Sequence, residues 1–216
     1  MDKYQVAIVI PALNESSTIS SVVKAVKEYG VPIVVDDGSI DNTAEIALRS
    51  GALVVRHKEN RGYDAALNAG FMKAENLGVQ IIITVDADGQ HNPSLVQNFI
   101  DAIDSGADIV VGVRSRQQRF FEYIFSWYAS LRFGIKDPLC GMKAYHIKVY
   151  KELGYFDSYN SIGTELMIFA LKKGYHLEQI EFDLQNRIDE SRFGRIFSGN
   201  YKVVRAMILS ILKKDL

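Results

Sequence analysis

VQIIITVDADGQHNP, residues 79–93, sets an apolar, β-branched run directly against two aspartates, a glutamine and a histidine. The apolar part is short and continuous rather than alternating, which is typical of a strand covered on both faces, as in a parallel sheet. Asp86 and Asp88 follow it one residue apart, so in extended backbone their side chains share a face. Two carboxylates placed in this way repel each other unless a cation lies between them. The stretch therefore predicts a buried strand that ends at a binding site.

Four more apolar runs of the same kind occur before residue 113, at 6–10, 32–36, 52–56 and 108–112. Helical patterns separate them, at 17–29, 42–49, 65–77 and 93–103. This alternation favours a single α/β domain with a Rossmann-like, doubly wound, mostly parallel sheet flanked by helices. The pattern then changes to an aromatic stretch at 120–134, a loop at 137–145, a helix at 164–174 and a strand at 176–184.

The composition narrows the class of protein. A formal net charge of -1 over 216 residues argues against a general nucleic-acid binder. The single cysteine, Cys140, excludes an internal disulfide framework, fits a reducing compartment, and is better explained as a small packed residue than as a nucleophile. The apolar runs are too short for a signal peptide or a bilayer span. We expect a cytoplasmic protein, with a position on the membrane surface left open.

Polar clusters follow each of the first four predicted strands. They are PALNE (11–15), DDGSIDNT (36–43), NRGYDAALNAG (60–70) and DADGQH (86–91). Ligands of doubly wound sheets bind outside the carboxyl ends of the strands, where these clusters should meet.

The pair Asp86 and Asp88 is a candidate metal site, with Gln90 or His91 completing or orienting the shell. Hard oxygen ligands suit Mg²⁺ or Mn²⁺, which proteins usually hold through one or two carboxylates plus substrate phosphates. A turn with solvated aspartates is the plainer alternative for an isolated D-x-D. The D-x-D of this chain follows the fourth predicted strand, and the other strands also end in polar residues, so the metal-site interpretation is favoured.

The segments VAIVIPALNES, VVDDGSIDNT, NRGYDAALNAG and VDADGQHNP resemble, in order and spacing, the motifs of family 2 glycosyltransferases with the GT-A fold. A narrower resemblance, to the dolichol-phosphate mannose synthase-like, polyprenyl-phosphate glycosyltransferases, rests on DADGQH, DPLCGMKAY (137–145) and RIDESRFG (187–194). The last segment departs from that subgroup at Glu190, where glycine is usual, and at Arg192, where lysine is usual. We expect a GT-A domain over residues 1–186 and a C-terminal segment over 187–216.

The resemblance implies a nucleotide site at the first two polar clusters. Its lining is expected to include Pro11, Ala12, Asn14 and Glu15. Asp36 and Asp37 are expected to read the base and the ribose, because a buried carboxylate needs a hydrogen-bond donor. Asp41 is better explained as a helix N-cap.

Arginines are the candidates for holding diphosphate or acceptor phosphate, because a guanidinium clamps phosphate oxygens. They are Arg61, Arg114, Arg187 and Arg192. Gly62 and Gly70 suit a close backbone approach. For any single arginine, a solvated surface position is the alternative.

Glu165 lies where family 2 enzymes that glycosylate hydroxyls carry an acidic general base. A hydroxyl must lose its proton during attack, whereas a phosphate monoester is already an anion at neutral pH, so with a lipid phosphate Glu165 would only position the acceptor. A helix N-terminal glutamate favoured by the macrodipole is the structural alternative. Asp137 has two open interpretations: a role in the site, or the start of an Asp-Pro turn.

These residues and the resemblance together predict a metal-dependent transferase that uses a GDP- or UDP-linked sugar and a polyprenyl phosphate acceptor. The resemblance implies inversion of configuration. Asp88, helped by Asp86 and Gln90, would hold the metal against the leaving diphosphate. Transfer to a glycan or small-molecule hydroxyl is the nearest alternative. A sugar-phosphate nucleotidyltransferase usually has a glycine-rich loop with Lys or Arg after its first strand, and it is disfavoured here because PALNESSTIS has no glycine. A binding module that has lost catalysis is a further alternative.

The chain from Arg187 onward has seven basic and three acidic residues, a formal charge of +4. Its last part is patterned as a basic amphipathic helix, which could lie on an anionic membrane or pack on the domain, a membrane protein or a second subunit. The aromatic stretch at 120–134 is a second interfacial candidate, because Trp and Tyr suit the headgroup region. Aromatic core packing explains that stretch equally well.

Overall fold

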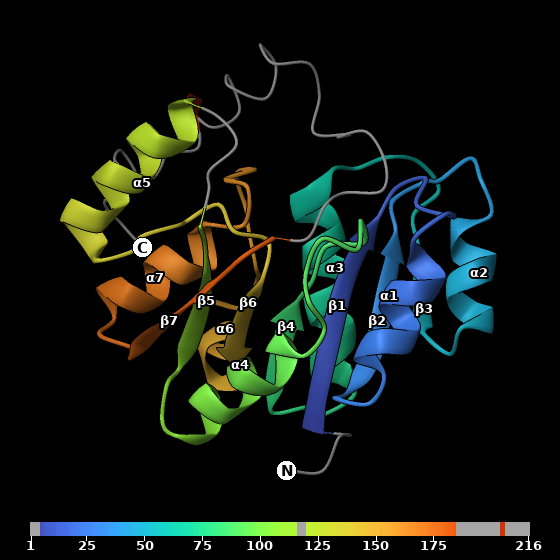
Figure 1. Cartoon of the computed structure of the whole chain (residues 1–216), viewed down its shortest axis with the longest axis horizontal. Coiled ribbons are helices and arrows are strands. Elements are labelled where there is room, and N and C mark those ends of the chain that lie inside the picture. The colour runs from blue at the N-terminus through green and yellow to red at the C-terminus, as the bar shows by residue number, and fades with distance from the viewer. Residues whose placement is uncertain (1–4, 116–119, 185–203, 206–216) are drawn as a thin grey trace.

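The computed structural model describes residues 5–115, 120–184 and 204–205. Within them, one seven-stranded sheet has the order β3-β2-β1-β4-β6-β5-β7, with helices on both faces (Figure 1). The strands are β1 (Val6–Ala12), β2 (Val31–Asp36), β3 (Leu53–Arg56), β4 (Ile81–Thr84), β5 (Ile109–Arg114), β6 (Lys143–His146) and β7 (Leu177–Phe182). The expected α/β fold is therefore confirmed.

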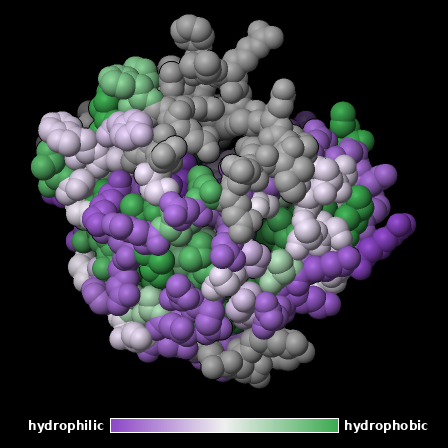
Figure 2. All heavy atoms as spheres, in the orientation of Figure 1, coloured by the Kyte–Doolittle hydropathy of each residue, from purple (hydrophilic) through white to green (hydrophobic). Residues whose placement is uncertain are grey.

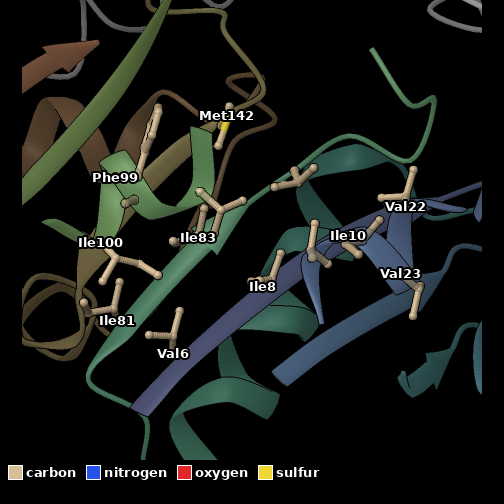
Figure 3. Close-up of a cluster of buried hydrophobic side chains, with 14 of the residues drawn as sticks. Val6, Ile8, Ile10, Val22, Val23, Ile81, Ile83, Phe99, Ile100 and Met142 are labelled. Atoms are coloured by element: carbon tan, nitrogen blue, oxygen red, sulfur yellow. The ribbon is translucent and has the colours of Figure 1, made fainter. Parts of the chain in front are cut away.

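The helices divide between the two faces of the sheet. They are α1 (Ile19–Val26), α2 (Thr43–Arg49), α3 (Tyr63–Asn76), α4 (Leu95–Asp104), α5 (Phe120–Phe133), α6 (Ile147–Leu153) and α7 (Glu165–Lys172). Buried side chains of α1, α2 and α4 share one core, and those of α3, α5, α6 and α7 share the other. Strand β1 serves both: Val6, Ile8 and Ile10 enter the first core (Figure 3), whereas Ala7 and Val9 enter the second. This double burial explains the continuous apolar runs.

Four strand pairs are parallel: β1 with β2, β1 with β4, β2 with β3, and β5 with β7. Strand β6 is antiparallel to both β4 and β5. The carboxyl ends of β1 to β4 therefore meet at one edge, as the polar clusters predicted.

The prediction of a loop over 137–145 is wrong in its last part, because β6 begins at Lys143 and α6 follows directly. The segment KAYH has no continuous apolar run and begins with a lysine, so its sequence does not indicate a buried strand. In the structure it lies in the interior of the sheet, between β4 and β5. The aromatic stretch forms α5, which buries Phe125 and Ala129 and exposes other side chains. None of the described helices is long and apolar enough to cross a bilayer.

Gly70 brings α3 close to the sheet. A Cβ atom there would lie 2.2 Å from Cγ1 of Val9 and 3.3 Å from Cγ2 of Val35, so the expected close approach is confirmed. Gly62 differs: no described atom lies within 4 Å of such a Cβ, and its φ of +94° is the reason for a glycine.

We predict that Gly70→Ala destabilises the protein. Helix propensity alone would stabilise it by about 1 kcal/mol, but overpacking against Val9 should instead cost about 1–3 kcal/mol. Urea unfolding measures the difference, with Met72→Ala, on the exposed side of α3, as the control. An unchanged or raised midpoint for Gly70→Ala would contradict the close contact.

Candidate functional site

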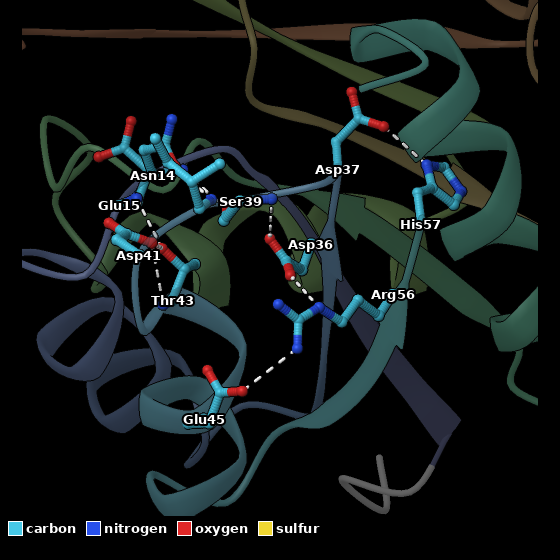
Figure 4. Close-up of polar contacts among 11 residues, drawn as sticks. Asn14, Glu15, Asp36, Asp37, Ser39, Asp41, Thr43, Glu45, Arg56 and His57 are labelled. Carbon is cyan, nitrogen blue, oxygen red and sulfur yellow. Dashed lines mark hydrogen bonds and ion pairs between the residues drawn. The ribbon is translucent and has the colours of Figure 1, made fainter. Parts of the chain in front are cut away.

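The loops after β1 and β2 are joined by hydrogen bonds at the edge of the sheet where the strands have their carboxyl ends (Figure 4). Asn14, at a φ of 54°, donates its backbone N–H to Oγ of Ser39 (2.8 Å), and its Oδ1 accepts from the backbone N–H of Ile40 (2.9 Å). The backbone N–H of Glu15 donates to Oγ1 of Thr43 (2.8 Å). Pro11 and Ala12, at the end of β1, pair in register with the last two residues of β2. The expected nucleotide-lining residues of the first cluster thus stand beside the second cluster.

Asp41 joins the same two loops. Its carboxylate accepts from the backbone N–H of Ser16 (3.2 Å) and from that of Thr43 (3.0 Å). The N-cap prediction is off by one residue, because the residue before α2 is Asn42, whose side chain makes no capping bond. Burial raises the pKa of Asp41, but the hydrogen bonds from Thr43 and Ser16 outweigh burial, so the pKa is lowered overall.

Asp36 and Asp37 both have partners within the chain. Oδ1 of Asp36 accepts from the backbone N–H of Ser39 (3.1 Å), and its Oδ2 lies 3.1 Å from Nε of Arg56. Register explains the second contact, because Asp36 and Arg56 are paired on β2 and β3.

The Asp37 carboxylate holds the loop after β3. It contacts Nδ1 of His57 at 2.6 Å and accepts from the backbone N–H groups of Arg61 (2.9 Å) and Gly62 (2.7 Å). Arg61 is itself exposed, and its backbone rather than its side chain is fixed here. The base, ribose and phosphate roles of these residues stay predictions.

Asp86, after β4, has an environment unlike that of these carboxylates. Among the described residues none donates a hydrogen bond to it, and it packs tightly on Gly141, where a Cβ would lie 2.1 Å from Oδ2 of Asp86. Burial raises its pKa, the charge of His91 lowers it, and Asp88 raises it again, for a net upward shift. A divalent cation would relieve both the burial and the repulsion, so these oxygens fit the predicted metal.

The rest of the D-x-D segment is held locally. Oδ1 of Asp88 accepts from the backbone N–H of Gln90 (3.0 Å). His91 is buried, with its ring edge-to-face on Phe182 at a centroid distance of 5.7 Å. The described residues contain no group of three or more His, Cys, Asp or Glu that could hold a metal. Further ligands would therefore be Gln90, water and substrate phosphate.

Arg114, at the end of β5, makes a bidentate contact with the Asp137 carboxylate. Nε lies 2.7 Å from Oδ2, and Nη2 lies 2.9 Å from Oδ1. Glu122 of α5 also accepts from Nη2, at 3.3 Å. Burial lowers the pKa of Arg114, but hydrogen bonding to Asp137 outweighs burial and raises the pKa overall. Among the described residues, none accepts a hydrogen bond from Nη1.

The loop over residues 156–163 is hydrogen bonded to α3 and to Glu165, the first residue of α7. Glu165 is fully buried. Its Oε2 accepts from the backbone N–H of Ser158 (2.5 Å), and its Oε1 accepts from Oγ of Ser158 (2.9 Å). Glu165 opens α7, as its helix N-terminal interpretation requires.

The sequence analysis missed Asp64, which holds the same loop from α3. Its carboxylate accepts from the backbone N–H groups of Ile162 (3.2 Å) and Gly163 (2.6 Å). An acidic residue in the first turn of a helix is common, and no local signal marks a partner 99 residues away. Arg187, Arg192 and most of the predicted C-terminal helix lie outside the described residues.

We predict that Asp64 makes stability fall as the pH rises. Burial, with the charge of Asp157, raises the pKa of Asp64 to about 6, although Lys143 and two backbone N–H groups oppose the shift. The unfolded chain has a pKa of about 4, so the folded state binds more protons between these values, and stability is lost as pH climbs through them. The shift corresponds to roughly 3 kcal/mol.

Urea unfolding from pH 4 to 7 measures this dependence. Asp64→Asn should flatten the fall relative to the wild type, whatever its absolute stability. Asp104→Asn, on the exposed side of α4, is the control and should keep the wild-type slope. Parallel curves for Asp64→Asn and the wild type would refute the assignment.

Comparisons with known proteins all indicate the same family for this chain. The sequence model of the family described as Glycosyl transferase family 2 matches residues 7–159. A dolichyl-phosphate hexose transferase of Haloferax volcanii is 26% identical over 97% of this chain and 95% of that protein. A polyprenol monophosphomannose synthase of Mycolicibacterium smegmatis is 32% identical over 68% of this chain and 63% of that protein. These relatives confirm the resemblance seen in the motifs.

Solved structures confirm the fold. Glucosyl-3-phosphoglycerate synthase from Mycobacterium tuberculosis, in complex with Mn²⁺, uridine-diphosphate and phosphoglyceric acid, superposes with a TM-score of 0.76 at 20% identity. The match covers 95% of this chain and 78% of that one. At such identity the likeness concerns architecture, and it agrees with the expected GT-A fold. With the family model matching most of its length and a polar edge built from that family's motifs, this chain belongs to glycosyl transferase family 2 and is a glycosyltransferase.

Proposed function

We propose that this glycosyltransferase moves a sugar from a nucleotide-diphosphate sugar to a polyprenyl phosphate, with inversion and with a divalent metal ion. The observation that carries the choice of acceptor is the state of Glu165. Both of its carboxylate oxygens are engaged by Ser158, and the side chain is fully buried. A hydroxyl acceptor would need such a group as a base, whereas a phosphate acceptor arrives already ionised.

The donor side rests on the carboxyl edge of β1, β2 and β4. Asp86 and Asp88, with Gln90, hold Mg²⁺ or Mn²⁺, and when bound the ion supplies positive charge against the leaving diphosphate. Crystal structures of glucosyl-3-phosphoglycerate synthase in complex with uridine-diphosphate and Mn²⁺ or Mg²⁺ support this assignment. The nucleotide, GDP- or UDP-linked, lies along the first two polar clusters. Its base and ribose meet the surface around Asp36 and Asp37.

The chain's own residues then orient the reacting groups. Asp137 and Glu122 fix Arg114, whose Nη1 donors face the phosphates, and Arg61 adds a second cation. The acceptor phosphate is held by Arg187 and Arg192 of the C-terminal segment, residues 187–216, and its oxygen attacks the anomeric carbon from the side opposite the diphosphate. The relatives named for dolichyl-phosphate and polyprenol substrates support this acceptor class.

A lipid-borne acceptor requires access to a bilayer, and α5 offers a matching surface. Four large side chains are exposed on one face of this helix: Phe120, Tyr123, Trp127 and Leu131. Figure 2 shows green and pale spheres gathered over α5 at the upper left. Aromatic rings suit the headgroup region, and the exposed Arg132 suits anionic lipid. On the opposite face, Glu122 contacts Arg114, so the orientation of this surface is tied to the site.

We therefore place the enzyme on the cytoplasmic face of the membrane as a peripheral protein. The exposed face of α5 and the basic C-terminal segment would contact lipid together. A charged segment and an aromatic face are two separate signals, which is the number that stable but reversible attachment generally needs.

Transfer of labelled sugar from a panel of GDP- and UDP-sugars to a short polyprenyl phosphate, with Mn²⁺ or with EDTA, tests the function. One donor should give metal-dependent product. Asp88→Ala should lower turnover by about a hundredfold or more, because charge stabilisation by a bound ion contributes several kcal/mol. Asp104→Ala is the control, since it removes an exposed aspartate of α4. Absence of product with every donor, or metal-dependent turnover in Asp88→Ala, would refute the proposal.

Membrane attachment is tested by sedimentation with vesicles of phosphatidylcholine and phosphatidylglycerol. The double variant Trp127→Ser, Leu131→Ser should bind at least about tenfold more weakly, because two large side chains would no longer be buried in lipid. Leu48→Ser, exposed on α2, is the matched control and should bind like the wild type. Equal binding of the double variant and the wild type would show that α5 does not contact lipid.

A further inference from the structure

Lys143 is a buried cation that the proposed chemistry does not use. It opens β6 and is 3% exposed. Burial lowers its pKa to about 8, opposed by the charges of Cys140, Asp137, Asp64 and Asp86. An ammonium group removed from water is unfavourable unless it is paired or hydrogen bonded. Among the described residues, its side chain has one hydrogen-bond acceptor: Nζ donates to the backbone carbonyl of Gly163, at 2.8 Å.

The residue pair Ile162–Gly163 is held from both sides. Its two backbone N–H groups donate to Asp64 of α3, while the carbonyl of Gly163 accepts from Lys143 of β6. Ile162 has a φ of 57°. A β-branched residue in the left-handed region is strained, and such a conformation persists only where the surroundings over-determine it. Asp64 and Lys143 together supply that constraint.

The loop that these contacts fix is also bound by Glu165 and Arg205, which the proposed function places on the acceptor side. Glu165, two residues after Gly163, opens α7 and returns to the loop at Ser158. The side chain of Arg205 donates from Nη1 to the carbonyls of Tyr159 (2.8 Å) and Asn160 (3.1 Å). A residue of the C-terminal segment thus contacts the same loop.

At its other end, Lys143 belongs to the strand that supports Asp86. Its backbone pairs with Thr84 of β4, whose Oγ1 accepts from the backbone N–H of Lys143 (3.1 Å) and donates to the carbonyl of Gly141 (2.7 Å). Gly141 is the residue on which the Asp86 carboxylate packs. A single residue, Met142, therefore lies between the residue that contacts Asp86 and the residue whose side chain reaches Gly163.

We propose that Lys143 is a positioning residue, which fixes the turn before Glu165 relative to Asp86 and so couples the acceptor side of the site to the metal side. The catalytic part of this inference rests on the proposed function, whereas its structural part does not. Without the Nζ contact, Ile162 and Gly163 keep their bonds to Asp64, and the loop keeps its internal bonds to Asp157, Ser161 and Glu165. The side-chain link from Gly163 to the strand beside Asp86 is lost.

Hydrogen exchange of the loop tests the structural part without any substrate. Lys143→Met keeps the length of the side chain and removes the donor. The backbone N–H groups over 158–165 should exchange at least about tenfold faster, the loss expected for one charge-assisted hydrogen bond. Lys151→Met, at an exposed position of α6, is the control and should exchange like the wild type. If Lys143→Met does not fold, Lys143→Leu, which also has no donor, takes its place with the same expectation. Unchanged exchange in the loop would overturn the proposal.

Turnover tests the coupling. In the variant, kcat should fall at least about tenfold, because a small misplacement of the groups around a reacting centre is costly. The KM for the nucleotide sugar, and the thermal shift given by the diphosphate with Mn²⁺, should stay within about twofold of the wild type. Faster loop exchange with unchanged kcat would reduce Lys143 to a purely structural role and overturn the coupling. A wild type without transferase activity would instead refute the proposed function and leave the exchange result valid.

Discussion

Buried carboxylates that accept hydrogen bonds from loop backbone N–H groups are the interaction on which the rest of this site depends. Asp37 holds the loop after β3, Asp64 holds the turn before α7, and Glu165 holds Ser158. A buried carboxylate is very unfavourable without such donors, and a loop amide is unfavourable without an acceptor. Each pairing therefore satisfies two groups at once. The irregular segments at the carboxyl edge of the sheet gain a fixed geometry from these contacts, which regular secondary structure does not give them.

Asp86 differs from these loop-holding carboxylates. Among the described residues it has no hydrogen-bond donor, and it lies against the bare backbone of Gly141. The two buried cations near it, Arg114 and Lys143, are both committed elsewhere: Arg114 to Asp137 and Glu122, and Lys143 to a backbone carbonyl. Their charges lower the pKa of Asp86 without pairing with it, while burial and Asp88 raise it. A site with an unsatisfied carboxylate and oriented cations around it suits a metal–diphosphate ligand.

Much of this arrangement was predictable, and the failures have particular causes. The five apolar runs and their polar ends located β1 to β5 and the edge where they meet, because burial on both faces leaves a strong local pattern. Strand β6 was not predicted, because it starts with a lysine, a residue type that is usually exposed. The nucleotide contacts of Asp36 and Asp37 stay predictions. Their partners within the chain, Arg56 and His57, could not be predicted from sequence, because the pairing of β2 with β3 brings them together.

The sequence by itself determined the class of the sheet, the edge that carries polar residues, and the family, since these follow from short-range patterns and from motifs in a fixed order. Tertiary structure decided which carboxylate oxygens of the described residues accept hydrogen bonds. Those of Asp37, Asp64 and Glu165 do, Asp86 accepts none, and Oδ2 of Asp36 has only its ion pair with Arg56. Sequence spacing carries no information on that point, because the partners of Asp64 and Lys143 lie 99 and 20 residues away along the chain. Whether a buried charge finds a donor depends on the packing of distant elements, and that packing distinguishes Asp86 from the carboxylates that hold loops.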